Sequence, residues 1–209
     1  MKIKILSIAT ILLIVASISS KTFAAGKNIS KTAEATATTL LENVSNINKI
    51  EVHGNVQLYV TNGLNDKIKV YDNYYNQNAL VQEQDGVLRI SSYKNEKLVV
   101  WVTVADLKLL SAYDNASVES FGKFSALDFS LNLNNSATAN FNMDCIEAKI
   151  AVSDSAKANI SGNASQTSLV INQSATVNAT QLIADNISTQ RVQPKAKVLA
   201  NVLDELAFN

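Results

Sequence analysis

Few residues in this chain carry the side chains that catalysis usually needs. His53 is the only histidine and Cys145 the only cysteine among 209 residues. A Ser-His-Asp or Cys-His site would depend on His53, and nothing near it in sequence indicates a nucleophile on a strained turn. One histidine and one cysteine cannot fill the usual ligand set of zinc, and no Asp-x-Asp-x-Asp calcium loop is present. We therefore predict a non-enzymatic protein with no catalytic residue, no cofactor and no metal site.

Carboxylates provide the alternative hypothesis of an enzyme that cleaves polysaccharides. Such enzymes line a groove with acidic residues that act as acid, base or nucleophile. Asp128 and Glu147 are the candidate pair for this reaction. Asp114, Asp144 and Asp154 would converge if the chain stacks upon itself, which is the remaining possibility for metal binding. Solvated acidic residues at turns are the simpler interpretation of these three aspartates, and no other sequence feature supports the pair. A carboxylate pair within about 10 Å across a groove would favour the enzyme.

Aromatic residues offer a different chemistry, which is ligand binding. Tyr71, Tyr74 and Tyr75 are clustered, with Tyr59 and Tyr93 nearby. Exposed tyrosines stack on sugars or pack against a partner protein, whereas buried ones fill packing space. The predicted ligand surface combines the clustered tyrosines with polar residues of the repeats described below, as follows: Tyr71, Tyr74, Tyr75, Asp114, Asn134 and Asp154.

A repeated pattern between residues 114 and 198 predicts how such residues are positioned. A polar turn followed by alternating small apolar and polar residues occurs five times, with matching positions at 114, 135, 154, 173 and 194. The repeat therefore has a period of about 20 residues. This period is too short for a pair of helices and is typical of β-solenoids. The leucine-rich consensus, which has a similar period, is absent.

Alternation within each repeat predicts half-buried strands. The series Leu127, Phe129, Leu131 and Leu133 alternates with polar residues, which predicts that all four side chains point inward. Successive coils would bury their apolar faces against one another through parallel strands about 4.8 Å apart. We expect the small inward residues to form one file, as follows: Ala116, Ala137, Ala156 and Ala175.

Residues 47–104 have larger side chains and longer loops than the repeats. Asn62-Gly63 and Asp85-Gly86 are turn signals between alternating segments, and residues 98–104 form a denser apolar strand. We interpret this part as irregular first coils or as antiparallel strands that cover the amino-terminal end of an all-β, single-domain solenoid. Residues 202–208 would then cover the other end.

The amino terminus predicts export. Lys2 and Lys4 precede an apolar run over residues 5–18, and cleavage is expected after Ala24 or Ala25. An uncleaved membrane anchor is the alternative, but the run is shorter than the roughly 20 residues of a typical span. We divide the chain into a signal peptide (1–25), a flexible spacer (26–46) and one β-domain (47–209). The mature chain would have no transmembrane segment and would lie in the periplasm, on the cell surface or outside the cell.

The charge balance argues against nucleic acid as a partner. Eighteen basic and eighteen acidic residues give a formal net charge of zero, whereas nucleic-acid binding usually requires a basic patch. A protein or a glycan at the cell envelope is therefore the expected partner. Cys145 lies inside a repeat, and an unpaired cysteine there is more typical of a buried residue than of a reactive one.

The order of these elements resembles the head GIN domain family of exported bacterial proteins, which are described as autotransporter adhesins. The resemblance covers residues 47–209 and rests on the segments 50–58 and 85–90 and on the repeats after Leu107. Family corners usually contain a Gly-Ser-Gly-Asp motif. Here they read Asp-Asn-Ala-Ser, Asn-Ser-Ala-Thr, Asp-Ser-Ala-Lys and Gln-Ser-Ala-Thr, and Asn and Asp partly replace glycine in the left-handed region.

The resemblance implies a β-solenoid fold and an adhesion-type or cell-envelope function. Since a fold does not define a function, two alternatives stay open. One is the polysaccharide-cleaving enzyme described above, and the other is a passive structural protein of the envelope.

Overall fold

The structure, a computed structural model, describes residues 38–41, 44–71, 79–92, 94–172 and 174–192. All of them belong to one compact unit, residues 35–209, and all regular elements are strands. The predicted signal peptide with Ala24 and Ala25, the fifth repeat and the predicted cap at 202–208 lie outside the described residues. Within the described residues, no helix has the length and apolar character required to cross a membrane.

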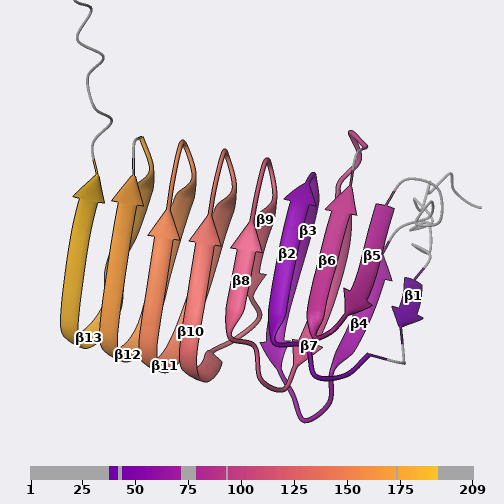
Figure 1. The fold of residues 1–209 in the computed structure, drawn as a ribbon, viewed down its shortest axis with the longest axis horizontal. Coiled ribbons are helices and arrows are strands. Elements are labelled where there is room, and N and C mark those ends of the chain that lie inside the picture. The colour runs from indigo at the N-terminus through magenta and orange to yellow at the C-terminus, as the bar shows by residue number, and fades with distance from the viewer. Residues whose placement is uncertain (1–37, 42–43, 72–78, 93, 173, 193–209) are drawn as a thin grey trace, which may run out of the picture. The chain divides into compact units, whose positions relative to one another are not determined.

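The strands join into one sheet of thirteen (Figure 1). Their bounds are β1 (Thr38–Leu41), β2 (Lys49–Gly54), β3 (Val56–Asn62), β4 (Lys67–Tyr71), β5 (Ala79–Gln84), β6 (Val87–Ser92), β7 (Leu98–Val104), β8 (Leu109–Ala112), β9 (Ser117–Ser120), β10 (Phe124–Leu133), β11 (Thr138–Val152), β12 (Lys157–Asn172) and β13 (Thr176–Val192). The long strands β11 and β12 each pair along nearly their whole length with the next strand, β12 and β13 respectively.

Residues 109–192 form parallel ladders with a nearly constant offset. Thr138 pairs with Lys157, and Lys157 pairs with Thr176, so the same sequence offset separates both pairs of partners. Figure 1 shows β10 to β13 side by side in chain order. Each strand therefore adds its backbone hydrogen bonds to the strand that precedes it by one repeat. We call one such repeat a layer.

Four small residues form the predicted file inside these layers. The amide of Thr138 donates to the carbonyl of Ala116 at 2.9 Å, and the next layers repeat this bond at 3.0 Å from Lys157 to Ala137. The same bond joins the following pair of layers, also at 3.0 Å. The four side chains are at most 5% exposed, namely Ala116, Ala137, Ala156 and Ala175. The prediction that these neighbourhoods are superposed is confirmed.

One predicted inward residue points outward instead. Phe129, Leu131 and Leu133 are buried, but Leu127 is 71% exposed. The ladder between β10 and β11 runs from Ala126 directly to Asp128, which shows that the chain changes direction at Leu127. The prediction for Leu127 was wrong because the alternation of apolar and polar residues continues through a corner of the chain. At this corner Leu127 points outward, although the next apolar residue in the series, Phe129, is buried.

A second corner repeats in successive layers and uses the left-handed backbone conformation. Asp114, Asn135 and Asp154 have φ angles of 59°, 60° and 61°. Asn and Asp adopt the left-handed conformation more readily than other residues with a side chain do, which explains why these corners can form without glycine. Gly54 occupies the equivalent corner between β2 and β3 with φ of 78°, and a Cβ there would overlap the carbonyl oxygen of Ser92.

Residues 49–104 contain the same kind of layer in a different order. β2 pairs in parallel with both β6 and β8, and β3 pairs in parallel with both β7 and β9. The layer β6–β7 therefore lies on one side of β2–β3, and β8–β9 lies on the other. Chain order and spatial order differ here, which the sequence did not predict.

Antiparallel strands end the parallel ladders at the amino-terminal side. β4 pairs antiparallel with β7 and β1, and β5 pairs antiparallel with β6. The turn at Asp85-Gly86 has φ angles of 53° and 77° and forms the expected hairpin between β5 and β6. Asn62-Gly63 also ends a strand, but β7 separates β3 from β4, so no hairpin forms there. β1 lies within the segment predicted as spacer and pairs with β4 instead.

The outward side chains of the layers lie on two surfaces. The β3 face is the outward side of β4, β7, β3, β9 and the amino-terminal parts of β11 to β13. The β2 face is the outward side of β6, β2, β8, the part of β10 after Leu127 and the carboxy-terminal parts of β11 to β13. The two faces meet at the left-handed corner.

Candidate ligand-binding surface

The polar residues predicted as a ligand surface lie at or beside the left-handed corner. Asp114 Oδ2 accepts a hydrogen bond from the Gly54 amide at 3.1 Å, and Asp154 Oδ2 accepts one from the Asn135 amide at 3.0 Å. Asn134 precedes the corner and donates its backbone amide to the carbonyl of Ala112. The two carboxylates thus hold the backbone of an adjacent layer, which gives them a structural role.

His53 lies next to this corner on the β2 face. Its ring stacks on Tyr113 with centroids 4.4 Å apart and an interplanar angle of 3°. Nδ1 is 3.9 Å from Asp114 Oδ2, and both side chains are exposed by about half. Because that carboxylate already accepts the Gly54 amide, the contact with His53 is a weak surface interaction.

Cys145 is separated from His53 by two strands. Cys145 belongs to β11 and His53 to β2, and β10 and β8 lie between them in the sheet. The thiol is buried, and this burial raises its pKa to about 11. A neutral thiol is a poor nucleophile, so the two residues do not form a Cys-His site.

The carboxylates proposed for polysaccharide cleavage do not face each other across a groove. Asp128 and Glu147 are register partners on β10 and β11 and therefore lie side by side on the β2 face, where Glu147 but not Asp128 lines a hollow with Gln166 and Asn186. Glu147 binds Lys149 Nζ at 2.7 Å, while Asp144 is 3.6 Å from Lys123 and remote from the left-handed corner. Among the described residues, His, Cys, Asp and Glu form no group of three that could hold a metal ion.

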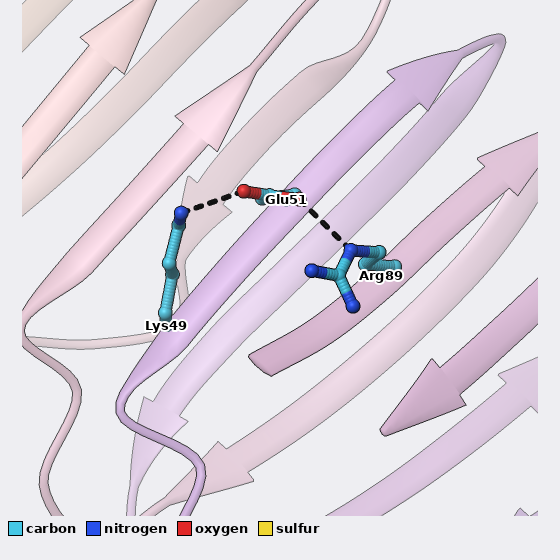
Figure 2. A network of polar contacts seen from close by, with 3 residues as sticks. All are labelled: Lys49, Glu51 and Arg89. Carbon is cyan, nitrogen blue, oxygen red and sulfur yellow. Dashed lines mark ion pairs between the residues drawn. The ribbon is translucent and has the colours of Figure 1, made fainter. Parts of the chain in front are cut away.

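A small ion network occupies the β2 face near the amino-terminal layers (Figure 2). Glu51 binds Lys49 at 2.7 Å and Arg89 at 3.2 Å, and it bridges β2 and β6. The hydrogen bond from Lys49, together with the charges of both cations, lowers the pKa of Glu51 despite its partial burial. Lys49 and Arg89 both pair with Glu51, so this network connects neighbouring layers of the protein.

Three aromatic side chains form an outward cluster on the β3 face. Tyr59 stacks on Trp101 with centroids 4.5 Å apart, and Phe121 meets Trp101 edge-on at 5.0 Å. Phe121 is 61% exposed, and Tyr59 and Trp101 are partly exposed. Exposed aromatic groups of this size are rare on a polar surface and are enriched where proteins bind partners. We call these three residues the aromatic cluster.

Sequence reasoning found only part of this cluster. Tyr59 belongs to the tyrosines that the sequence suggests as ligand contacts, Trp101 belongs to the dense apolar strand over residues 98–104, and no sequence pattern indicates Phe121. The alternation in β7 contained the signal, because Trp101 lies between the buried residues Val100 and Val102. Tyr71 shares the β3 face through its pairing with Val99. Tyr74, Tyr75 and Tyr93 lie outside the described residues.

Comparison with known families matches residues 46–208 to the family described as putative auto-transporter adhesin, head GIN domain. The chain belongs to this family. The head GIN match begins just before β2 and includes every layer described above. No curated protein sequence matches the chain.

Solved structures share the fold of this head GIN protein. A putative adhesin from Bacteroides fragilis has a TM-score of 0.66 at 16% identity, covering 77% of this chain and 79% of its own. A putative adhesin from Parabacteroides distasonis has a TM-score of 0.57 at 16% identity, with 75% and 78% covered. A putative lipid binding protein from the same species has a TM-score of 0.59 at 12% identity, with 76% and 79% covered. At these identities the similarity shows an all-β fold with parallel strands.

Proposed function

We propose that this head GIN protein is an exported, non-enzymatic adhesion-type protein that binds a protein or a glycan at the cell envelope. The observation that carries the proposal is the aromatic cluster of Tyr59, Trp101 and Phe121 on the outward β3 face. Aromatic side chains provide large, rigid contact areas at a small cost in conformational entropy. The family and two of the structural neighbours are described as adhesins, which supports the same class of function.

The fold that presents this cluster is proposed to be a β-solenoid. Its support is the repeated sequence offset between paired strands, together with the file of small residues along one wall. A column of this kind keeps outward side chains of successive layers in register. The ligand would then meet a surface whose chemistry is set by side chains one strand spacing apart.

Enzymatic cleavage is a weaker candidate, since Asp128 and Glu147 lie side by side on neighbouring strands and only Glu147 lines the hollow beside them. A passive envelope protein is the third candidate, and it gives no reason for exposing Phe121 beside Trp101. A test that removes one aromatic ring therefore separates binding from both alternatives.

The experiment compares purified wild-type protein with Trp101→Ala on glycan arrays, immobilised envelope proteins and lipid vesicles. Vesicles are included because one structural neighbour is described as a putative lipid binding protein. We expect wild-type protein to bind glycan or protein, and Trp101→Ala to lose at least about tenfold in affinity. The control is Leu127→Ala, which removes another exposed apolar side chain away from the cluster. Equal binding by Trp101→Ala and wild type would overturn the proposal.

Export is tested separately by amino-terminal sequencing of the secreted protein. Cleavage after Ala24 or Ala25 gives a mature chain that begins at Ala25 or Gly26. A protein that keeps residues 1–25 and stays in the membrane fraction would contradict the proposed signal peptide.

A further inference from the structure

A single row of outward side chains extends from the aromatic cluster across the β3 face. Each member is the register partner of the next on the neighbouring strand. From β4 to β13 the row consists of Lys69, Trp101, Tyr59, Glu119, Asn140, Asn159 and Asn178. We call it the lateral row, and it runs perpendicular to the strands with one residue per strand.

The asparagine end of the lateral row presents amide groups to solvent. Asn140, Asn159 and Asn178 are all exposed, and Asn159 Nδ2 donates to Asn140 Oδ1 at 3.2 Å. Thr180 donates to Asn178 Oδ1 through both its amide and its hydroxyl group, at 3.2 and 2.8 Å. Within the described part of the chain, Asn140 Nδ2, Asn159 Oδ1 and Asn178 Nδ2 have no hydrogen-bond partner. The row thus offers donors and an acceptor at intervals of one strand spacing.

The charge of the lateral row is balanced. Lys69 and Glu119 carry opposite charges and flank the rings of Trp101 and Tyr59, while the remaining members are neutral. A strongly charged ligand would gain nothing from this arrangement. Hydroxyl groups and apolar ring faces complement amides and aromatic rings, and both are combined in a sugar.

We propose that the lateral row binds a neutral, linear polysaccharide that lies across the strands. Sugar rings would contact the aromatic cluster, and hydroxyl groups along the polymer would bond to the three asparagines. The inference rests on the proposed function and adds the ligand class. A polymer of repeating units suits a row whose own groups repeat once per strand.

An extended peptide is a less suitable ligand for this row. Sheets recognise extended peptides mainly by adding a strand at an edge, where backbone N–H and C=O groups are free. The lateral row lies on the face of paired strands, whose backbone groups are already used in the ladders. A ligand there must bind through side chains alone, as a sugar does.

The experiment measures binding of neutral oligosaccharides of increasing length by calorimetry, using cello-oligosaccharides and manno-oligosaccharides. Affinity should rise with length until the oligosaccharide spans the row. We expect Asn159→Ala to weaken binding of the long oligosaccharides about three- to tenfold, the loss of one or two hydrogen bonds. Trp101→Ala should weaken binding at least about tenfold at every length.

Asn186→Ala is the matched control, because Asn186 is an exposed asparagine outside the row. It should bind like wild type, and all variants should keep the wild-type melting temperature within a few degrees. Affinity independent of length, or Asn159→Ala equal to wild type, would overturn the lateral row and leave the proposed function standing. Binding that requires Trp101 but is seen only with a peptide or protein would also overturn the lateral row and leave the proposed function standing. If the wild-type protein binds no glycan and no protein, both the lateral row and the proposed function are overturned.

Discussion

The two halves of the domain use the same layer but assemble it differently. In residues 109–192 the chain adds one layer after another, so order in the sequence is order in space. In residues 49–104 the layer β6–β7 is on one side of β2–β3 and the chain then crosses to the other side to form β8–β9. The comparison shows that parallel pairing alone does not require a serial order, and that the serial order coincides with the regular repeat length.

Inward side chains differ between the halves in the same way. The regular half places alanine at each corner and concentrates large rings in one cluster of Phe124, Phe129 and Phe141, with centroids 5.0 to 5.4 Å apart. The amino-terminal half fills its interior with valine, isoleucine and leucine along β2, β3, β6 and β7.

Phe141→Ala should have the largest effect on stability and tests the phenylalanine cluster of the regular half. The side chain is fully buried against Phe124 and Phe129, so its removal leaves a cavity. We expect a loss of about 3–5 kcal/mol in the free energy of unfolding, measured by denaturant titration. Phe121→Ala, at an exposed position, should cost less than about 1 kcal/mol. Similar losses in both variants would show that the regular half has no distinct core.

Ala156→Leu tests how narrow the interior is in the regular half. Three additional carbon atoms at a fully buried corner should destabilise by about 1–3 kcal/mol through overpacking. Ala175→Leu should cost less, because Val177 and Ala179 beside it on β13 are only partly buried. Thermal melting measures both, and Lys157→Leu on the outward side is the control. Unchanged melting of Ala156→Leu would contradict the assigned register.

Asp154→Ala and Asp114→Ala compare two left-handed corners of the regular half, of which only the Asp114 corner contacts the amino-terminal half, through the Gly54 amide. Each variant removes a carboxylate that accepts a backbone amide of the adjacent layer, at 3.0 Å and 3.1 Å. Each also places alanine at a positive φ, so we expect a loss of about 1–2 kcal/mol in both. Asp154→Gly keeps the conformational freedom and should recover part of the loss. A large effect of only one of the two variants would show that the contact with the amino-terminal half and the contact within the regular half are not equivalent.

Glu51→Gln should have the smallest effect, confined to the amino-terminal half. Lys49 and Arg89 lower the pKa of Glu51 in the folded protein. Between this lowered pKa and the ordinary pKa of a glutamate, the unfolded state therefore binds more protons than the folded state does. The stabilisation of the folded state by ionised Glu51 is therefore complete above the pKa that a glutamate has in the unfolded chain. It is lost as the pH falls through the lowered pKa of Glu51 in the folded protein. We expect less than about 1 kcal/mol at neutral pH, because the network is partly exposed.

Melting temperatures of wild type and Glu51→Gln across this pH range provide the measurement. The difference between them should shrink on acidification. A difference that grows at low pH would contradict the assigned direction of the shift.

The sequence predicted the regular half well because its period repeats a local pattern. Asp114 and Asp154 at positive φ and the file from Ala116 to Ala175 followed from that period. Leu127 was predicted wrongly, since an apolar residue at a corner continues the alternation without facing the core.

The amino-terminal half was less predictable because alternation says which side of a strand is buried but not which strand is its neighbour. Tyr59, Trp101 and Phe121 come from three separate segments of the sequence, and only the unexpected position of β6–β7 brings the first two together. The candidate site therefore depends on a pairing that no local pattern encodes.

The equal offset that relates β10 to β11 and β11 to β12 has a consequence for how this gene can change. An in-frame duplication or deletion of one repeat in this region inserts or removes one whole layer. Every remaining strand still pairs in parallel and keeps the same side chains facing inward. The number of repeats in this segment therefore sets the length of the exposed asparagine row. Gain or loss of one repeat would change the length of the protein by one layer and leave the fold of the other layers unchanged.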